Sequence, residues 1–388
     1  MTKVNDDSSS FLKKFLAAYS YRYDYKSDSL IGHDGPVEFS HVISQLRVYA
    51  LNSGGLQYKN YFRDLLACWK KDESLKCLHE FREKIRHLKS RPDLVSSFLE
   101  AVSDQRTDLD AIVLRHWIWQ VKRKLFGLEI DHHIMPVLFG KSGAGKSVAI
   151  RSLIEPLHDF TLSVDMSILS DQFSKRQFTR NYIVFFDELD GAESTDINRI
   201  KQIITAENME YRVMRTEGYF YGRQNSSFIG CSNSPIRDRI SDPTSARRFW
   251  QITTKDKIDW NTINTLDYQS LWQSVDENSP APIVSRLDKV TAIQEEEIRT
   301  TTIIEEWLKM SYVLDESSKC NLRTSDLFEN FKEWKEWQSI TFPISFQKFA
   351  RELKYEAKKV YGKDIAPSHS WNGTAWPLKL IEEKRKAG

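Results

Sequence analysis

The first hundred residues carry apolar positions at the three-residue and four-residue spacing that is typical of helices. Two such sets are Val42, Leu46 and Ala50, followed by Phe62, Leu65 and Leu66. Turn residues separate these helical segments. The pattern predicts an all-α N-terminal domain over residues 1–105, which is followed by one long helix over 107–126.

The central part of the chain alternates short apolar runs with helical patterns. The runs 134–139 and 182–186 have the length and composition of buried strands, and 160–169 has a weaker strand pattern. A helical pattern over 197–206 follows. Strands that alternate with helices predict a parallel sheet covered by helices on its faces. We therefore assign residues 106–275 to an α/β domain.

The C-terminal part has a different pattern, which begins after a polar linker over 276–300. Three helices are predicted here: 301–313, 324–337, and a third that begins after the capping residue Ser345. A short two-stranded wing is predicted around 371–373 and 376–381. Three helices and then a wing are the order of a winged-helix domain, which we assign to 301–388.

Composition narrows the class of protein. The chain has 388 residues and a formal net charge of +2, so any surface that binds nucleic acid has to be local. Its four cysteines form no C-x-x-C pair, which argues against a disulfide framework and a zinc site. No apolar run approaches the roughly 20 residues of a membrane span, and no secretory segment is recognisable. We expect a cytoplasmic protein without a membrane partner.

The apolar run 134–139 leads into GKSGAGKS, which fills every fixed position of the phosphate-binding loop G-x-x-x-x-G-K-[ST]. In such a loop backbone N–H groups surround phosphate oxygens, the lysine brings positive charge to the outer phosphates, and the serine hydroxyl can ligate Mg²⁺. The alternative is a Gly-rich turn that matches by chance. The sequence predicts ATP and Mg²⁺ as ligands, held by Gly140, Gly143, Ala144, Gly145, Lys146, Ser147 and Val148.

An acidic pair, Asp187 and Glu188, ends the apolar run 182–186. Ligands collect at the carboxyl ends of parallel strands, so these acids are expected beside the phosphates. Asp187 would then join Ser147 in holding Mg²⁺, and Glu188 would orient and deprotonate the attacking water. Acids at a strand end are also common helix caps, which is the alternative role.

Two later features extend the predicted catalytic set. Asn233 follows a predicted strand, where its side chain could sense the γ-phosphate or position water. Arg247 and Arg248 form an adjacent pair, and one of them could act as an arginine finger on the transferred phosphoryl group. An ordinary surface ion pair is the alternative for these arginines.

Two segments have the composition of nucleic-acid contacts. A hairpin is predicted between strands 211–215 and 226–233, and its turn combines guanidinium with aromatic groups: Arg215, Tyr219, Phe220, Tyr221 and Arg223. The third C-terminal helix has a basic face made by Lys348, Arg351, Lys354 and Lys358. Aromatic packing in a subunit interface and a merely solvated basic face are the respective alternatives.

Five segments together resemble the motifs of superfamily 3 helicases: GKSGAGKS, YIVFFDELDG, IKQIITAENMEYRVMR, SFIGCSNSP and DPTSARRFW. The similarity is greatest to the virulence-associated protein E type and to related replication initiators of phage satellites and pathogenicity islands, and it extends over about 108–252. Two pairs, Cys231-Ser232 and Ser245-Ala246, depart from the common pattern of the family.

This resemblance implies an AAA+-like P-loop fold and a hexameric ring with ATP at the subunit boundaries. It implies that Lys146 and Ser147 belong to the Walker A motif, that Asp187 and Glu188 form Walker B, and that Asn233 is the sensor. It also implies a hairpin that tracks DNA, in a region that contains Lys201, Arg212, Arg215, Tyr219, Phe220 and Arg223.

From the residues and the resemblance we predict an ATP-dependent DNA helicase and replication initiator of a phage, satellite or mobile element. The winged helix would bind origin duplex DNA, and the ring would move along single-stranded DNA. The N-terminal hundred residues contain no recognisable primase constellation, so any primase partner would be encoded separately. The alternatives are a DNA-binding ATP-dependent switch without unwinding activity and a small-molecule P-loop kinase.

Overall fold

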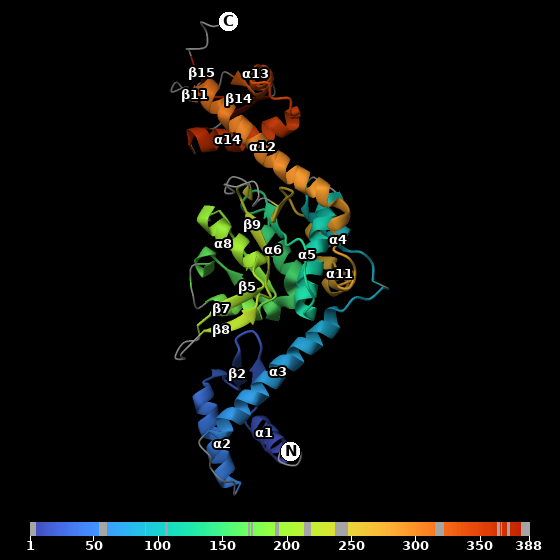
Figure 1. Ribbon diagram of the computed structural model, residues 1–388, viewed down its shortest axis with the longest axis vertical. Helices are drawn as coiled ribbons and strands as arrows, with labels where there is room; N and C mark the ends of the chain where they lie inside the picture. Colours follow the sequence, from blue (N-terminus) through green and yellow to red (C-terminus); the bar gives the residue numbers. More distant parts are fainter. Residues whose placement is uncertain are drawn as a thin grey trace. The chain divides into compact units, whose positions relative to one another are not determined.

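The computed structural model describes residues 5–53, 60–89, 91–104, 108–169, 171, 174–190, 194–212, 219–236, 247–314, 322–362, 365, 367–370 and 373–381. The chain divides into two compact units, each of which is drawn in Figure 1. The first unit comprises Met1–Asn233 and Gln251–Val284. The second unit comprises Ser234–Trp250 and Ser285–Gly388.

The N-terminal part of the first unit contains three helices, α1 (Asn5–Ala18), α2 (Phe39–Asn52) and α3 (Tyr61–Ile85). Their apolar faces share one core. The spacing of Val42, Leu46 and Ala50 along α2 is confirmed as a buried stripe, and Phe62 and Leu66 of α3 are buried in the same core, against which Leu65 packs.

An antiparallel sheet lies within this helical part, so the prediction of an all-α N-terminal domain is wrong. Its strands are β1 (Arg22–Asp24), β2 (Ser29–Gly32) and β3 (Gly35–Val37). Gly32 pairs with Gly35 across the tight turn between β2 and β3, and Gly35 has a φ of +117°. Strands of three or four residues are too short to show an alternating pattern, and so the turn residues alone were visible in the sequence.

The centre of the first unit is a five-stranded sheet in the order β10-β4-β9-β6-β5. The strands are β4 (Met135–Phe139), β5 (Thr161–Val164), β6 (Ile183–Phe186), β9 (Ser227–Ser232) and β10 (Phe249–Thr253). The first two residues of β10 are counted with the second unit. The pairs β4–β9, β9–β6 and β6–β5 are parallel. Every residue of β4, β6 and β9 is buried, as expected of strands covered on both faces. The predicted α/β class is confirmed.

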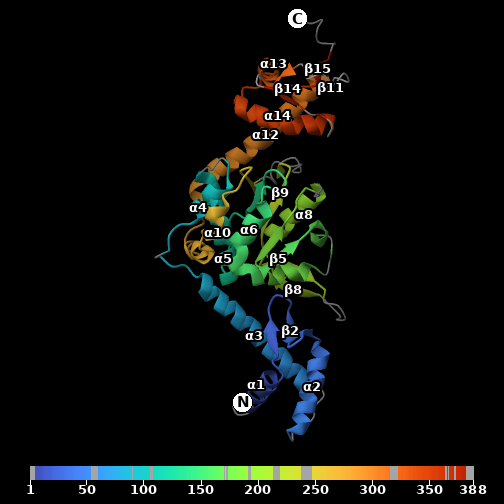
Figure 2. The same cartoon turned by 180° about the vertical axis from the view of Figure 1, so that it is seen from behind.

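Helices cover this sheet on both sides. In both views α5 (Asp108–Phe126) and α6 (Lys146–Ile154) lie on one side, and α8 (Ser194–Thr205) lies on the other (Figures 1 and 2). α11 (Tyr268–Gln273) packs against α6. The buried indole of Trp117 in α5 donates to the carbonyl of Phe228 in β9 at 2.8 Å. This bond satisfies the polar atom of a large core side chain.

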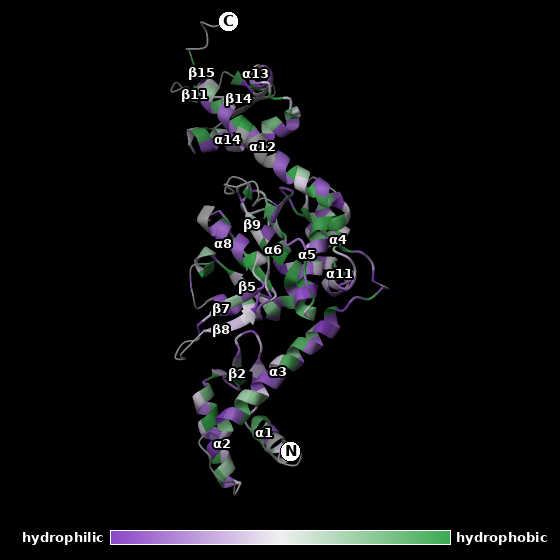
Figure 3. Cartoon of the chain, in the orientation of Figure 1, coloured by the Kyte–Doolittle hydropathy of each residue, from purple (hydrophilic) through white to green (hydrophobic). Residues whose placement is uncertain are grey.

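Shorter helices complete the first unit. They are α4 (Val95–Val102), α7 (Gln177–Arg180), α10 (Trp260–Thr265), and the 3₁₀ helices η1 (Glu155–Phe160), η2 (Met166–Leu169) and η3 (Ser174–Arg176). α4 is drawn mostly as hydrophobic in Figure 3, in agreement with its five buried apolar residues. No helix among the described residues combines the length and the apolar composition that a membrane span needs.

The hairpin between α8 and the sheet differs from the prediction. β7 (Asn208–Tyr211) pairs with β8 (Phe220–Arg223) in antiparallel register, with Tyr211 opposite Phe220. The predicted return strand 226–233 is instead β9, between β4 and β6. The physical reason is burial: all six residues of β9 are buried, whereas β8 is largely exposed.

The second unit contains α12 (Leu287–Ser311), α13 (Thr324–Trp337) and α14 (Phe346–Tyr361). Trp307, Phe331 and Phe349, one from each helix, pack together in its core. α13 and α14 agree with the sequence, and the Ser345 hydroxyl accepts a hydrogen bond from the backbone N–H of Lys348 as the expected cap. The prediction for α12 is wrong at its start, because the helix begins within the segment 276–300 that we expected to be a linker.

Two small sheets accompany these helices. β11 (Tyr312–Leu314) pairs with β15 (Leu378–Leu380), and a second sheet has the order β12-β14-β13. Its strands are β12 (Leu322–Arg323), β13 (Ser368–Ser370) and β14 (Gly373–Trp376). The predicted wing, with strands around 371–373 and 376–381, is wrong in its pairing: β13 pairs with β14, with Ser370 opposite Gly373, whereas Leu378–Leu380 is β15 and pairs with β11. A 3₁₀ helix, η5 (Val284–Arg286), precedes α12.

Candidate nucleotide-binding site

The loop between β4 and α6 has the backbone conformation that its glycines permit. Gly143 and Gly145 have φ values of +79° and +95°, which side-chain-bearing residues rarely adopt. Gly145 is also restricted sterically, because a Cβ built on it would lie 2.2 Å from Cζ2 of Trp260 in α10. The loop therefore packs directly against an indole ring, and no residue other than glycine fits at position 145.

Lys146 lies at the first position of α6 and is buried. Its Nζ donates to the carbonyl oxygens of Gly140 and Lys141 and to Oδ1 of Asn233, each at 2.8 Å. Burial lowers the pKa of the Lys146 ammonium, and this effect is opposed by the nearby groups of Cys231 and Asp190. The ammonium is thus held inside the loop, where the phosphates of a nucleotide would add anionic acceptors.

The loop, the acids after β6 and the polar end of β9 line one cavity of 420 Å³. Because β4, β6 and β9 are parallel neighbours, their carboxyl ends meet at one edge of the sheet. The predicted residues in the lining are Gly143, Gly145, Lys146, Ser147, Val148, Asp187, Glu188 and Asn233. Gly140 contributes its carbonyl to Lys146, and Ala144 is buried within the loop.

The two predicted acids have different surroundings. Asp187 is half-buried and accepts a hydrogen bond from Nη2 of Arg151 at 2.5 Å. Glu188 is exposed at the cavity. Arg151 lies one helical turn after Ser147 on α6, and this four-residue spacing is the signal by which the sequence could have indicated it.

Asp190 is a site residue that the sequence reasoning missed. Its carboxylate accepts from the backbone N–H of Asn233 at 2.8 Å, from Nδ2 of Asn233 at 2.7 Å, and from the hydroxyl of Ser232 at 3.1 Å. It therefore connects the end of β6 to the end of β9. The signal was present in the sequence as a third acid, two residues after the predicted pair.

Oxygen ligands for Mg²⁺ are available in this cavity. The lining includes the Ser147 hydroxyl and the carboxylates of Asp187, Glu188 and Asp190. Mg²⁺ prefers oxygen ligands and usually takes only one or two from protein carboxylates, with the rest from water and phosphate. No group of three or more His, Cys, Asp or Glu residues within the described ranges forms a metal site of its own. The side chains fit a metal ion that arrives with a nucleotide.

Cys231 and Ser147 meet at the base of the cavity, with the serine Oγ 4.0 Å from the cysteine Sγ. Burial raises the pKa of the Cys231 thiol to about 12, so the thiol is neutral near pH 7. Because Mg²⁺ prefers oxygen and the thiol is neutral, the Ser147 hydroxyl is the better Mg²⁺ ligand of these two groups.

The predicted arginine pair belongs to the second unit and directly precedes β10. Arg247 is exposed, whereas Arg248 is partly buried. Their assignment as finger residues stays a prediction.

The residues predicted to contact single-stranded DNA lie on α8 and on the β7–β8 hairpin. Tyr219 and Phe220 are 59% and 42% exposed, and the Arg212 guanidinium lies 5.3 Å from the centre of the Tyr219 ring. Arg223 is already engaged, because its Nη2 donates to the carbonyl of Leu128 at 2.6 Å. Lys201 is partly buried on α8. Arg215 lies outside the described residues.

The four predicted basic residues of α14 are not equivalent. Lys348 is half-buried and pairs with Glu296 of α12 at 2.8 Å, and Arg351 pairs with the adjacent Glu352 at 3.1 Å. Lys354 and Lys358 are exposed. Lys354 and Lys358 are therefore the two most accessible positions of this face.

Comparison with known proteins gives one family and several distant folds. The virulence-associated protein E-like domain matches residues 83–297. No curated protein matches the chain. The apo A-form structure of the NrS-1 C-terminal region is similar with a TM-score of 0.41 and 14% identity, over 76% of this chain and 77% of that one. A ligand-bound JCV helicase has a TM-score of 0.34 and 12% identity, over 78% of this chain and 92% of that one.

Proposed function

We propose that this chain, which belongs to the virulence-associated protein E-like family, is an ATP-dependent DNA helicase that acts in the replication of a phage, satellite or other mobile element. The observation that carries the proposal is the shared cavity of the phosphate-binding loop, the acids after β6 and Asn233 after β9. A phosphate-binding lysine, carboxylates and a polar acceptor in one cavity are the groups that ATP hydrolysis requires.

In this proposal each side chain has one role. Lys146 would bind the outer phosphates, and Ser147 and Asp187 would hold Mg²⁺, which would supply positive charge beside the transferred phosphoryl group. Glu188, which is exposed at the cavity, accepts a proton from the attacking water. Asp187 would leave Arg151 in order to reach the metal.

The role of Asn233 follows from its two partners. A lysine can only donate and a carboxylate can only accept, so the amide must present Oδ1 to Lys146 and Nδ2 to Asp190. When Lys146 turns to a phosphate, Oδ1 becomes available as an acceptor. An acceptor suits the attacking water better than the γ-phosphate, and so we assign Asn233 to positioning water.

The proposal includes a hexameric ring that acts on DNA. Exposure of Arg247 supports a finger that reaches a neighbouring subunit. Exposed aromatic and guanidinium groups on the β7–β8 hairpin support contact with single-stranded DNA. The order of α12, α13 and α14, together with a sheet in which β14 lies between β12 and β13, supports a winged helix that binds origin duplex DNA. A separately encoded primase would supply primers.

Strand displacement tests this function directly. The full chain is mixed with a forked DNA that carries a fluorophore and a quencher on opposite strands, and ATP is added. The proposal expects ATP-dependent separation that Lys146→Ala abolishes. ATPase activity without displacement, together with ATP-dependent DNA binding, would instead favour the switch that assembles on DNA without unwinding it.

A further inference from the structure

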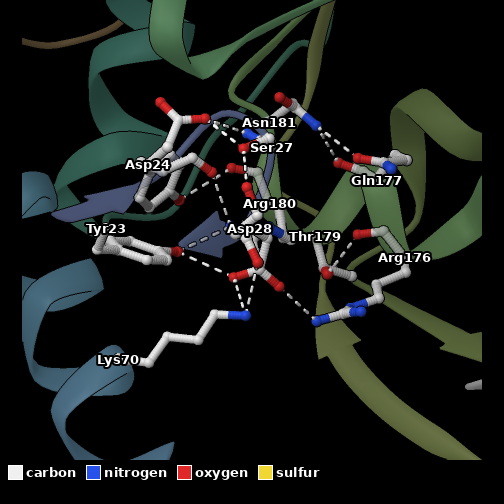
Figure 4. Close-up of polar contacts among 12 residues, drawn as sticks. Tyr23, Asp24, Ser27, Asp28, Lys70, Arg176, Gln177, Thr179, Arg180 and Asn181 are labelled. Carbon is white, nitrogen blue, oxygen red and sulfur yellow. Dashed lines mark hydrogen bonds and ion pairs between the residues drawn. The ribbon is translucent and has the colours of Figure 1, made fainter. Parts of the chain in front are cut away.

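The turn between β1 and β2 brings an acid into contact with three cations from distant segments. Asp28, which has a φ of +52°, pairs with Nζ of Lys70 in α3 at 3.0 Å. It also pairs with Nη2 of Arg176 at 3.0 Å and with Nη1 of Arg180 at 2.6 Å. Figure 4 shows Lys70 and Arg176 reaching the carboxylate from two sides.

These groups line a cavity of 460 Å³ in which cationic side chains outnumber carboxylates. Its lining contains four cationic side chains and a single carboxylate, that of Asp28: Lys70, Lys71, Arg176 and Arg180 are the cations. Burial raises the pKa of Asp28, but Arg180 and Lys70 outweigh this effect and hold the pKa below its ordinary value. Asp28 is therefore ionised at neutral pH, and the cations of the lining outnumber its single carboxylate by three.

The remaining lining provides apolar and neutral polar surface. The rings of Tyr23 and Phe39 and the hydroxyl-bearing Ser74 contribute to the cavity. The Tyr23 hydroxyl donates to Oδ1 of Asp28 at 3.0 Å, which fixes the ring at the edge of the cluster. Arg176 has 45% of its side chain exposed, and Lys71 is also exposed, so two of the cations are accessible from solvent.

We propose that this cavity is a second phosphate site, which binds one nucleotide unit. Arg176 and Lys71 would contact the phosphate, Lys70 and Arg180 would add charge, and Asp28 would serve as the internal counter-ion. The volume lies within the range of roughly 300–1,000 Å³ that is common for small-ligand sites. The phosphate could belong to a single-stranded nucleic acid or to a free mononucleotide. The proposal does not rest on ATP hydrolysis at the loop.

A merely structural cluster and a phosphate site differ in what Asp28 does. If the cluster only joins β1–β2 to η3 and α7, then loss of the Asp28 charge weakens folding and changes no anion affinity. If the cavity binds phosphate, Asp28→Asn removes a competing negative charge, and affinity for the anion rises by about fourfold. Arg176→Gln and Lys71→Gln act in the opposite direction, each lowering affinity by about tenfold.

The test uses the full chain with Lys146→Ala, which removes the principal phosphate ligand at the loop. One arm measures anisotropy of a fluorescein-labelled oligothymidylate of about 12 nucleotides at several salt concentrations. A lost phosphate contact lowers the slope of log affinity against log salt by about 0.7. The other arm measures the increase in melting temperature that AMP or inorganic phosphate produces.

Lys76→Gln is the matched control, because Lys76 lies on α3, pairs with Glu73 and does not line the cavity. If Asp28→Asn raises and Arg176→Gln lowers the affinity for the oligonucleotide, the site binds a nucleic-acid strand. If the two variants instead change the AMP-induced increase in melting temperature in these opposite directions, the site binds a free nucleotide. If Arg176→Gln does not fold, the affinity of Lys71→Gln is compared with that of Asp28→Asn in its place. Affinities in both arms that match those of the Lys76 control overturn the proposal.

Discussion

Asn233 connects Lys146 to Asp190: its Oδ1 accepts from the ammonium at 2.8 Å, and its Nδ2 donates to the carboxylate at 2.7 Å. Asp190 thereby fixes which atom of the amide faces the phosphate-binding loop. We expect Asp190→Ala to lower kcat for ATP by about 10- to 100-fold, the usual cost of losing a partner that orients a functional side chain. The KM for ATP should change less. Steady-state ATPase assays measure both, with Glu83→Ala as an exposed acidic control on α3.

Substitutions of Lys146 and of Glu188 should impair ATP hydrolysis at different steps. Lys146→Ala removes the charge at the outer phosphates and should abolish ATP turnover. Glu188→Gln should bind nucleotide normally, while kcat falls by about 10²- to 10⁴-fold, because the amide cannot accept the proton of water. Binding of a fluorescent ATP analogue is measured beside turnover. Normal turnover in the Glu188 variant would show that another group is the base.

The β4 to α6 region could be predicted from the sequence because its signals are local. A buried run, glycines at fixed positions and Lys146-Ser147 specify the turn, and α6 follows directly. The acids Asp187 and Glu188 were also predictable, since β6 is an uninterrupted apolar run. Asp190 was visible only as a third acid: its hydrogen-bond partners could not be predicted, because they depend on β9 lying beside β6, and this pairing is not local in sequence.

The same reason explains the other differences. The cluster around Asp28 joins residues about 150 positions apart in the chain, from the β1–β2 turn to η3 and α7. No spacing rule connects them. α12 was predicted too short because its first half is rich in charged residues, although Val290 and Gln294 are buried there.

Buried Lys124 should make folding stability depend on pH. Burial lowers the pKa of Lys124 to about 7, with a further contribution from Arg223. Its Nζ donates to Oε1 of Gln224 and to the carbonyl of Ser226. Between pH 7 and the ordinary lysine pKa the unfolded chain binds more protons than the folded one, so the free energy of unfolding rises with pH in this window.

The Lys124 contribution to this rise is at most about 1.4 kcal/mol for each pH unit, and it is absent below pH 7, where both states are protonated. Urea unfolding of the wild-type chain and of Lys124→Met at pH 7 and pH 9 isolates this residue. The variant should lack part of the rise. An identical rise in both proteins would show that Lys124 keeps an ordinary pKa in the fold.

Mixing two inactive variants tests whether Arg247 or Arg248 acts on a neighbouring subunit. If one of Arg247 and Arg248 acts on the nucleotide of a neighbouring subunit, its change to alanine should lower kcat by about 10³-fold or more. A finger variant mixed with Lys146→Ala should recover some ATPase, because some interfaces then pair an intact loop with an intact arginine. No recovery despite demonstrated subunit exchange, with turnover by a monomer, would exclude action between subunits.

The exposed part of the α14 basic face should bind duplex DNA. Reversal of Lys354 and Lys358 to glutamate should lower the salt slope of duplex binding by about 0.9 for each lost phosphate contact. Basal ATPase should not change. Lys332→Glu on α13 provides a control at an exposed lysine. Unaltered duplex affinity in the double variant at physiological salt would remove this surface from the proposed function.

The place of β9 between β4 and β6 makes the β7–β8 hairpin an insertion in the α/β architecture. The chain leaves at the end of α8 and returns at Ser227, and the base of the hairpin is closed by a bond from the backbone N–H of Gln224 to the carbonyl of Glu207. The register of β4, β9 and β6 is set by their own pairing and not by β7 and β8. Substitutions in β7 and β8 can therefore accumulate while the sheet that positions the cavity keeps its pairing.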